Sequence, residues 1–447
     1  NGRSDLYLYF YLHTLNLLNK DGFHCFICSN SWLDAGFGVW IQEFLLNKVR
    51  MHYIIDNHAK RSFSGADVNT IITLFEAPQK ENKWHKEFVR FVAFKRPFEE
   101  TVITENLFTI DGTEEITIDS AYRNYVLSHQ ELENEGKDNT GEKELEGKYI
   151  GAKWGGKFFR APDIHLKILL EKPNLLKKIS SVAEVNEGRP TGANDYFFVK
   201  KEVAKEYGIE KEFLLNGLMK TKGMAHEKIN ASDLDRYFLV VSQNESWHLK
   251  KVSKYIEYGE KEIVPKSKTL SQKKNWWAFS DRKVADLLAP CGIGDKFFCA
   301  INEAGAITSN SYTEIRLHCP GYLPHIHRSL NSPFGWMQLE IAGRNALGGG
   351  MLKTDPIEFR DIYFVTDPAL ASLKIIDRKV KSVFKECGIN PESGTPIEEQ
   401  EPHPLPDRKA LDDVIFDALE LTQEERKDVY RAVCRLVWNR ISKAKNK

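Results

Sequence analysis

The first 75 residues alternate apolar runs with polar turns, and this order restricts the fold more than any other feature of the sequence. Residues 5–18 place apolar side chains on nearly every side of a helix, which predicts a helix buried on both sides. A strand-length apolar run at 23–28, a second helical spacing at 37–46 and two β-rich runs at 52–55 and 68–75 follow. This order of elements predicts an α/β domain.

Three groups of residues in this region resemble the later motifs of gamma-class adenine-specific DNA methyltransferases. They are Ser4-Asp5-Leu6-Tyr7 with Phe10, Gly22-Phe23 with Ser29-Asn30-Ser31-Trp32-Leu33, and Arg61-Ser62-Phe63 with Val68-Asn69-Thr70-Ile71-Ile72. The resemblance is specific because several short motifs occur in the family's order at plausible gaps. It covers this region directly and the chain up to Pro368 more loosely. In that family, a target-recognition domain follows the catalytic domain.

The resemblance implies that residues 1–98 are the C-terminal half of a Rossmann-like methyltransferase domain. The family's glycine-containing cofactor motif and its Asn/Asp/Ser-Pro-Pro-Tyr/Phe catalytic motif precede these groups, and neither occurs here, where no two prolines are adjacent. We therefore expect a C-terminal fragment of an enzyme that uses S-adenosylmethionine to methylate adenine N6. The fragment alone is expected to be inactive.

The same resemblance assigns roles to three residues. Phe63 matches the family's aromatic residue that stacks on the flipped adenine, and Leu6 and Phe10 lie in the motif that lines the adenine pocket of the cofactor. Residue type alone leaves another explanation open for each of them. Leu6 and Phe10 could belong to the helix core, and the ring of Phe63 could lie beneath the hairpin.

A change of composition follows the expected strand at 87–94. Residues 99–146 contain 14 acidic and three basic side chains. Because such a segment repels phosphate, we expect residues 99–160 to form an acidic connecting segment away from DNA. An acidic mimic of DNA is the alternative.

Residues 161–375 are expected to form an α+β target-recognition domain. The loop Gly188 to Asn194 offers Arg189, Thr191 and Asn194 beside two glycines, and Arg and Asn side chains can contact guanine and adenine edges. Alone, the loop could be an ordinary surface turn. It resembles the entry to the target-recognition domain of this methyltransferase group and of related specificity subunits.

A basic stretch supplies the second group of candidate DNA contacts. Residues 248–283 contain ten Lys or Arg and four Asp or Glu, with Lys273, Lys274, Trp276 and Trp277 among them. Lysines interleaved with indoles suit phosphate neutralisation and stacking, although one Trp is expected inside the core. Elements at 306–315 and 329–333 also resemble recurring parts of such domains. They and the following residues add Ser309, Asn310, Tyr312, Asn331 and Arg344 to the candidates.

The C-terminal residues contain no motif that indicates a catalytic or binding site. Residues 376–406 are rich in Pro, Glu, Gly and Ser, which is typical of a linker. Residues 407–447 have two amphipathic stretches, and Thr422 with Glu425 forms a capping box at the start of the second. A helical tail is expected there.

Several classes of protein and site are excluded. Cys25 and Cys28 form a CxxC pair within an expected strand, where residues three apart face opposite sides, and Cys319 with His325 and His327 fits no structural zinc spacing. We therefore expect no metal. No apolar run is long enough to span a membrane and no signal peptide is present, so we expect a cytoplasmic protein without a membrane partner.

Together these observations favour the target-recognition part and a piece of the catalytic domain of a site-specific adenine-N6 DNA methyltransferase from a restriction-modification or defence system. Its expected partners are double-stranded DNA and an endonuclease domain or subunit. The alternative is a non-catalytic, sequence-specific DNA-binding module that keeps a degenerate half methyltransferase domain. Methylation of RNA or protein fits less well, because the recognition elements resemble those of DNA systems.

Overall fold

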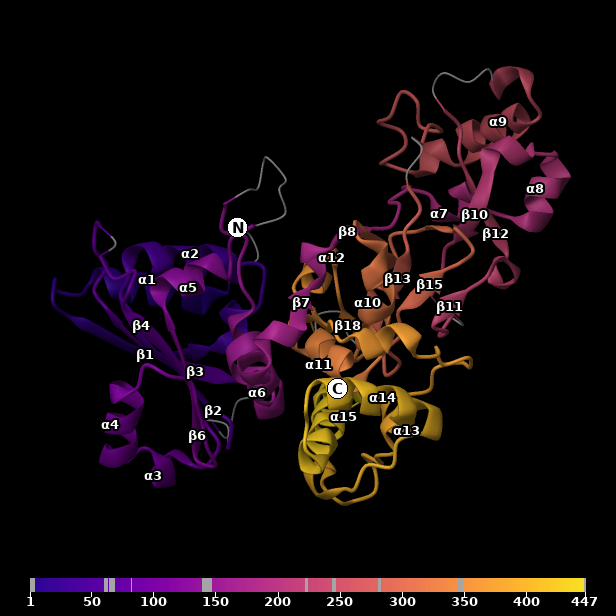
Figure 1. The fold of residues 1–447 in the computed structure, drawn as a ribbon. Helices are drawn as coiled ribbons and strands as arrows, with labels where there is room; N and C mark the ends of the chain where they lie inside the picture. Colours follow the sequence, from indigo (N-terminus) through magenta and orange to yellow (C-terminus); the bar gives the residue numbers. More distant parts are fainter. Residues whose placement is uncertain are drawn as a thin grey trace. The chain divides into compact units, whose positions relative to one another are not determined.

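The computed structural model describes residues 5–59, 63, 69–81, 83–138, 147–221, 224–242, 247–279, 283–344 and 349–445 (Figure 1). The chain divides into two compact units, Asn1–Asp163 and Ile164–Lys447. In the parts that the structure describes, no helix is both long and apolar enough to cross a membrane.

Unit 1 is built on a six-stranded mixed sheet in the order β1-β3-β2-β4-β6-β5. Its strands are β1 (Phe23–Ser29), β2 (Met51–Asn57), β3 (Thr70–Glu76), β4 (Phe88–Phe94), β5 (Thr117–Ile118) and β6 (Tyr122–Ser128). Strand β3 pairs antiparallel with both β1 and β2, and β2 pairs parallel with β4. Helices α1 (Leu6–Asn16) and α2 (Gly38–Lys48) precede β1 and β2, which confirms the predicted order of elements.

Alternation along β3 explains how this sheet buries one face. Ile71, Thr73 and Phe75 are buried, while the residues between them are partly exposed. The Tyr11 hydroxyl of α1 donates to Thr73 Oγ1 at 3.0 Å, so the helix is fixed to this buried face by both packing and a hydrogen bond.

Helix α1 is buried on one side only, contrary to the sequence-based expectation. Leu8, Tyr11 and Leu15 face the core, whereas Leu6, Tyr9, Phe10 and Leu17 are largely exposed. The reason is geometric, because the helix contacts the sheet along a single stripe and no other described segment covers its second apolar stripe.

The expectation of an acidic connecting segment at 99–160 is wrong for most of its length. Strand β6 lies inside the sheet, paired with β4 from Phe88↔Ser128 to Phe94↔Tyr122. The buried guanidinium of Arg123 donates to the carbonyls of Phe158, Phe159 and Ala161. Composition concealed this strand because exposed acidic side chains flank its apolar residues. Residues 139–146 lie outside the described part of the chain.

Unit 2 is an α+β body with two main sheets. Their orders are β16-β10-β12-β9 and β11-β15-β13-β17-β8. The strands are β8 (Ala183–Glu187), β9 (Phe198–Lys200), β10 (Leu214–Leu218), β11 (Lys228–Ile229), β12 (Arg236–Leu239), β13 (Leu287–Pro290), β15 (Ala300–Asn302), β16 (Ile307–Thr308) and β17 (Tyr312–Leu317). The short turn between β16 and β17 therefore passes from one sheet to the other.

Short strands and helices complete unit 2. The strands β7 (Leu176–Lys178) and β19 (Tyr363–Val365) pair with each other, as do β14 (Gly292–Ile293) and β18 (Leu352–Lys353). The helices before the C-terminal region are α6 (Asp163–Glu171), α7 (Asn194–Phe197), α8 (Lys201–Tyr207), α9 (Val252–Glu262), α10 (Leu323–Leu330), α11 (Pro333–Ala342) and α12 (Pro356–Arg360). Helices α7, α8 and α9 gather around β10 and β12 in one lobe, which has its own apolar core (Figure 1).

The expected linker at 376–406 is packed against unit 2. It contains α13 (Val383–Cys387), and Ile376, Val380, Ile389 and Ile397 are buried. The expected helical tail is present as α14 (Pro406–Ala418) and α15 (Gln423–Lys445). The Thr422 amide donates to Glu425 Oε2 at 2.8 Å, as in a capping box, and α15 packs against α11.

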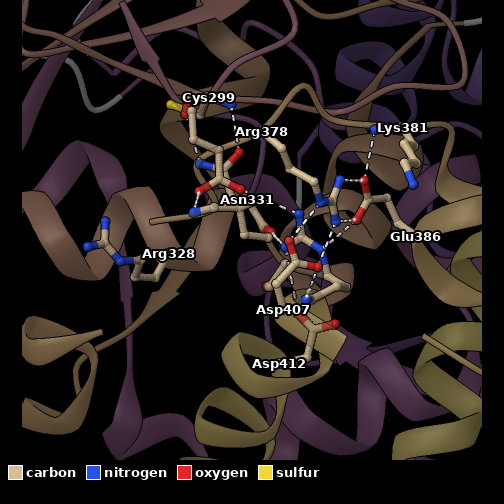
Figure 2. A network of polar contacts seen from close by, with 12 residues as sticks. Cys299, Arg328, Asn331, Arg378, Lys381, Glu386, Asp407 and Asp412 are labelled. Atoms are coloured by element: carbon tan, nitrogen blue, oxygen red, sulfur yellow. Dashed lines mark hydrogen bonds and ion pairs between the residues drawn. The ribbon is translucent and has the colours of Figure 1, made fainter. Parts of the chain in front are cut away.

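A buried ionic network joins this C-terminal region to the rest of unit 2. The side chain of Arg408 in α14 is completely buried, with Nε 3.3 Å from Glu386 Oε2 and Nη2 3.4 Å from Glu227 Oε1. Nη1 donates to the carbonyl of Asn331 and lies 3.8 Å from Asp412 Oδ1. Figure 2 shows this network, with Glu386, Asp412 and Asn331 among the labelled residues. Burial raises the pKa of Asp412 to about 8, even though the positive charge of Arg408 acts in the opposite direction.

Candidate nucleic-acid interface

Three loops of unit 2 meet at one surface, which we call the three-loop rim. They are residues 188–194, which follow β8 and end at the first residue of α7, residues 266–274 after α9, and residues 308–311, which run from the last residue of β16 to the start of β17. The Arg189 amide donates to the Thr308 carbonyl at 2.7 Å, which joins the first loop to the third. A Cβ on Gly188 would lie 2.2 Å from the Ser309 carbonyl oxygen, so this close approach requires glycine.

The second loop joins the rim at Gly192. Ser267 Oγ donates to the Gly192 carbonyl at 3.1 Å and accepts from the Leu270 amide at 3.3 Å. Gly192 has φ +78°, a conformation that favours glycine, and a Cβ there would lie 3.1 Å from Thr269 Cβ. The lysines of this loop, Lys266, Lys268, Lys273 and Lys274, are all exposed.

A chain of side-chain hydrogen bonds crosses from the first loop to the third. Thr191 Oγ1 donates to Asn194 Oδ1 at 2.6 Å, and Asn194 Nδ2 donates to Asn310 Oδ1 at 3.2 Å. Thr191 is fully buried, Asn194 is half-buried and Asn310 is exposed. The chain therefore begins in the interior and ends at the protein surface.

Arg189 lies at the inner side of the rim. Its guanidinium carbon is 6.0 Å from the centre of the Phe279 ring, within the range of a cation–π contact. The side chain as a whole is half-buried.

The two neighbouring tryptophans differ in environment. Trp276 is 4% exposed and lies in the core of the α7–α9 lobe, with its ring 5.4 Å from Tyr196 and 6.2 Å from Phe197. Trp277 is half-buried beside Trp247 at 5.1 Å. Trp276 is thus a structural residue, and this corrects the prediction that its ring contacts DNA.

Three further candidates are buried and hydrogen-bonded within the protein. Ser309 Oγ donates to the Met219 carbonyl at 2.6 Å, and the Tyr312 hydroxyl donates to the Lys220 carbonyl at 3.0 Å. Asn331 is anchored between the backbone amide and carbonyl of Cys299. These side chains hold the backbone, so their assignment as DNA contacts is also corrected.

The contacts of Arg344 are with residues outside the rim. Its guanidinium is ion-paired with Asp355 and lies 3.6 Å from Glu358, and its backbone pairs with Lys353. It is partly exposed, but its charge is already compensated by these carboxylates.

In unit 1, the three residues assigned by resemblance are exposed. Leu6 is 67% exposed and Phe10 is 58% exposed, one helical turn apart on the uncovered stripe of α1. They therefore do not belong to the helix core of the described structure. Phe63 is 48% exposed, and the motif residues Ser4, Arg61, Ser62 and Val68 lie outside the described residues.

Metal ligands do not gather in the described ranges, where no group of three or more His, Cys, Asp or Glu side chains is placed to hold an ion. Cys25 is exposed and Cys28 is buried, which agrees with their expected positions on opposite sides of β1.

Sequence reasoning missed Ser267, Thr269 and Phe279 as parts of the rim. The signal that could have found Ser267 and Thr269 is the Lys-Ser-Lys-Thr run at 266–269, which combines phosphate-binding charges with short hydroxyl side chains that favour a turn. No local pattern marks Phe279, because its contact with Arg189 depends on the tertiary fold.

Two protein-family descriptions match the chain. The C-terminal domain of type II methyltransferase M.Eco57I matches residues 151–387, and the Eco57I restriction-modification methylase matches residues 1–63. The type II methyltransferase M.AccI of Acinetobacter calcoaceticus is 24% identical over 295 residues, which are 64% of this chain and 48% of that protein.

Two solved structures are also similar. The type IIG restriction endonuclease BpuSI aligns with a TM-score of 0.47 and 14% identity, over 96% of this chain and 49% of its own. The type IIL restriction-modification enzyme MmeI in complex with DNA aligns with a TM-score of 0.33 and 11% identity, over 97% of this chain and 48% of its own. The chain thus spans about half the length of these relatives. Because residues 151–387 make up more than half of its 447 residues, the chain belongs to the type II restriction-modification methyltransferase family of M.Eco57I.

Proposed function

We propose that this chain carries the DNA target-recognition surface and part of the catalytic domain of a site-specific adenine-N6 methyltransferase that uses S-adenosylmethionine. The observation that carries the proposal is the three-loop rim, where a half-buried arginine, an exposed amide and four exposed lysines share one surface. Amide and guanidinium groups discriminate base edges, while lysines neutralise phosphates. The proposed partner is double-stranded DNA, with an endonuclease domain or subunit in the same system.

The charge distribution supports the choice of DNA. The whole chain has a net charge of zero, so attraction to phosphate must come from a local excess of positive charge. No described acidic side chain lies within ion-pair distance of Lys268, Lys273 or Lys274, whereas Lys266 pairs with Glu262 at 3.2 Å. Unpaired ammonium groups release counterions from DNA when they bind it, and this release drives association.

Replacement of both Lys273 and Lys274 with glutamine tests this surface. The full chain is expected to bind a random-sequence duplex with a strong salt dependence, and the double variant should lower the slope of log K against log salt by about 0.9 for each lost phosphate contact. The measurement is fluorescence anisotropy at a series of salt concentrations. Lys409 and Lys427, which are ion-paired with Asp413 and Glu401, provide the matched control. Equal slopes for the wild type and the Lys273/Lys274 variant would remove this loop from the interface.

The exposed apolar groups of unit 1 support a catalytic role in the intact enzyme. Adenine N6 cannot be reached within a stacked duplex, so the target base must leave the helix and be held by stacking. We assign this stacking to Phe63 and contact with the cofactor's adenine ring to Leu6 and Phe10, whose exposed side chains fit an apolar ring. S-adenosylmethionine supplies the methyl group when it is bound. Strand β1 lies at the edge of the unit 1 sheet and exposes Phe23 and Ile27. An edge strand has unpaired backbone groups, so β1 can pair with a strand from a further part of a catalytic domain.

Substitution of Phe63 separates stacking from a role in stability. In the full-length enzyme, Phe63→Ala is expected to weaken binding of the extrahelical base by about 1–3 kcal/mol while leaving the melting temperature nearly unchanged, because the ring is about half exposed. Phe63→Tyr should retain most of the stacking. The measurement is the fluorescence of 2-aminopurine at the target position, read together with thermal melting. A Phe63→Ala variant that melts early but still holds the extrahelical base would assign the ring to the core.

A non-catalytic specificity module is the second candidate. It is favoured by the fact that all three loops of the rim belong to unit 2 and need no residue of unit 1. Transfer of labelled methyl groups from S-adenosylmethionine to DNA by the protein of the complete reading frame distinguishes the two. Methyl transfer supports the enzyme, and its absence from a protein that binds DNA supports the module.

A further inference from the structure

We infer that Thr191, Asn194 and Asn310 form an oriented relay that presents the amide NH₂ group of Asn310 as a hydrogen-bond donor to an acceptor on a DNA base edge. This inference rests on the proposed DNA-recognition function and adds the chemistry of the base that is read. Thr191 is a positioning residue in this relay, since it is fully buried and acts through Asn194.

The direction of the relay follows from the two hydrogen bonds of the Thr191 hydroxyl. The Ala193 amide N–H can only donate, and it donates to Thr191 Oγ1 at 3.1 Å. The hydroxyl uses one lone pair to accept this bond and directs its own hydrogen to Asn194 Oδ1 at 2.6 Å. With Oδ1 as the acceptor, the amide of Asn194 must turn its Nδ2 towards Asn310 Oδ1, at 3.2 Å.

The reverse orientation is disfavoured by burial. If Asn194 Nδ2 donated to Thr191, the hydroxyl hydrogen of Thr191 would need another acceptor. Thr191 is fully buried, and no other acceptor for this hydroxyl is present among the residues that the structure describes. A buried hydroxyl without an acceptor is costly, so the need of the Thr191 hydrogen for an acceptor determines the orientation of both asparagines.

The consequence is a defined chemical character for Asn310. Its Oδ1 already accepts a hydrogen bond from Asn194, and its exposed Nδ2 has no acceptor within the described ranges. In the major groove, guanine shows two acceptors, O6 and N7, while cytosine shows the N4 amino donor. A fixed donor matches guanine best and rejects cytosine. Adenine shows only one such acceptor, N7, so a single NH₂ group finds fewer partners there than on guanine.

Selection of binding sites from a random duplex pool tests this assignment with the full chain. The wild type is expected to enrich a site with guanine at one position that depends on Asn310. Thr191→Val keeps the shape but removes the hydroxyl, so it should lose the preference at that position and keep the others. Thr354→Val makes the same chemical change on another buried threonine of unit 2, which lies outside the rim and donates to the Pro290 carbonyl at 3.3 Å, and it should leave the selected site unchanged.

A variant at the surface guards against a folding effect at Thr191. Asn310→Asp replaces the exposed donor with an acceptor and should shift the preference at this position from guanine towards cytosine, whose N4 amino group donates. Replacing that guanine with 7-deazaguanine should weaken binding by the wild type about tenfold and leave binding by Asn310→Ala unchanged. An unchanged site for Asn310→Asp, or an equal effect of 7-deazaguanine on both proteins, would overturn the relay. A wild type that enriches no sequence would instead contradict the proposed function itself.

Discussion

Replacement of Arg408 with methionine is expected to lower the free energy of unfolding of unit 2 by about 3–5 kcal/mol. The guanidinium stands between Glu227, Glu386 and Asp412, all buried, and also covers the Trp336 ring at 4.7 Å. Methionine fills part of the space, but it leaves the buried Glu227 without its paired guanidinium and the Asn331 carbonyl without this donor, while Glu386 keeps its ion pair with Arg378. Urea unfolding followed by circular dichroism measures the loss.

Arg435 provides the matched control for this substitution. It lies in α15, the helix that follows α14, and its guanidinium is 3.3 Å from Glu398 at the surface. Because exposed ion pairs contribute about 0–1 kcal/mol, Arg435→Met should change the unfolding free energy only slightly. Equal effects of the two substitutions would show that the stability of α14 and α15 does not depend on the buried network.

Replacement of Trp276 with alanine is the second change with a large expected effect. Its ring is enclosed by Tyr196, Phe197 and the other apolar residues of the α7–α9 lobe, so its removal should destabilise the lobe by about 3–5 kcal/mol. Since the ring does not reach the surface, molecules that remain folded should bind DNA as the wild type does. Thermal melting and DNA binding well below the melting temperature are measured on the same sample.

Trp40 is the control for this second prediction, because it is 53% exposed and stacks on Phe44 at 6.0 Å. Trp40→Ala should cost much less stability than Trp276→Ala. A Trp276→Ala variant with wild-type melting and lost DNA binding would contradict the structural role and return this ring to the interface.

The helices and strands of unit 1 could be predicted where the spacing of apolar residues and the polar turns that bound them indicate the same element. Residues 23–28 and 68–75 were recognisable as strands because apolar β-formers are bounded by polar turns, and β1 and β3 occupy them. Strand β6 was missed because composition was averaged over residues 99–146, which concealed a short apolar run between acidic helices. Local periodicity would have been a better guide there than charge.

The rim was predictable in part. The sequence indicated the loop 188–194 and the region of Asn310, but it could not show that their amides touch, because the two asparagines are 116 residues apart. Burial was the main source of error, since Ser309 and Asn331 have side chains typical of a DNA-binding loop but donate to the distant backbone carbonyls of Met219 and Cys299. The Arg408 network could not be predicted either, because it depends on a tertiary contact with Glu227, which lies 181 residues earlier in the chain.

Hydrogen–deuterium exchange of the full chain, with and without a bound random-sequence duplex, tests the central claim most directly. DNA on the three-loop rim should slow amide exchange in residues 189–194, 266–274 and 308–311, because bound backbone opens less often. The acidic residues 99–119 should exchange at the same rate in both samples, since their charge repels phosphate. Unchanged exchange in the rim, with protection elsewhere in the chain, would contradict the assignment of this surface to DNA recognition.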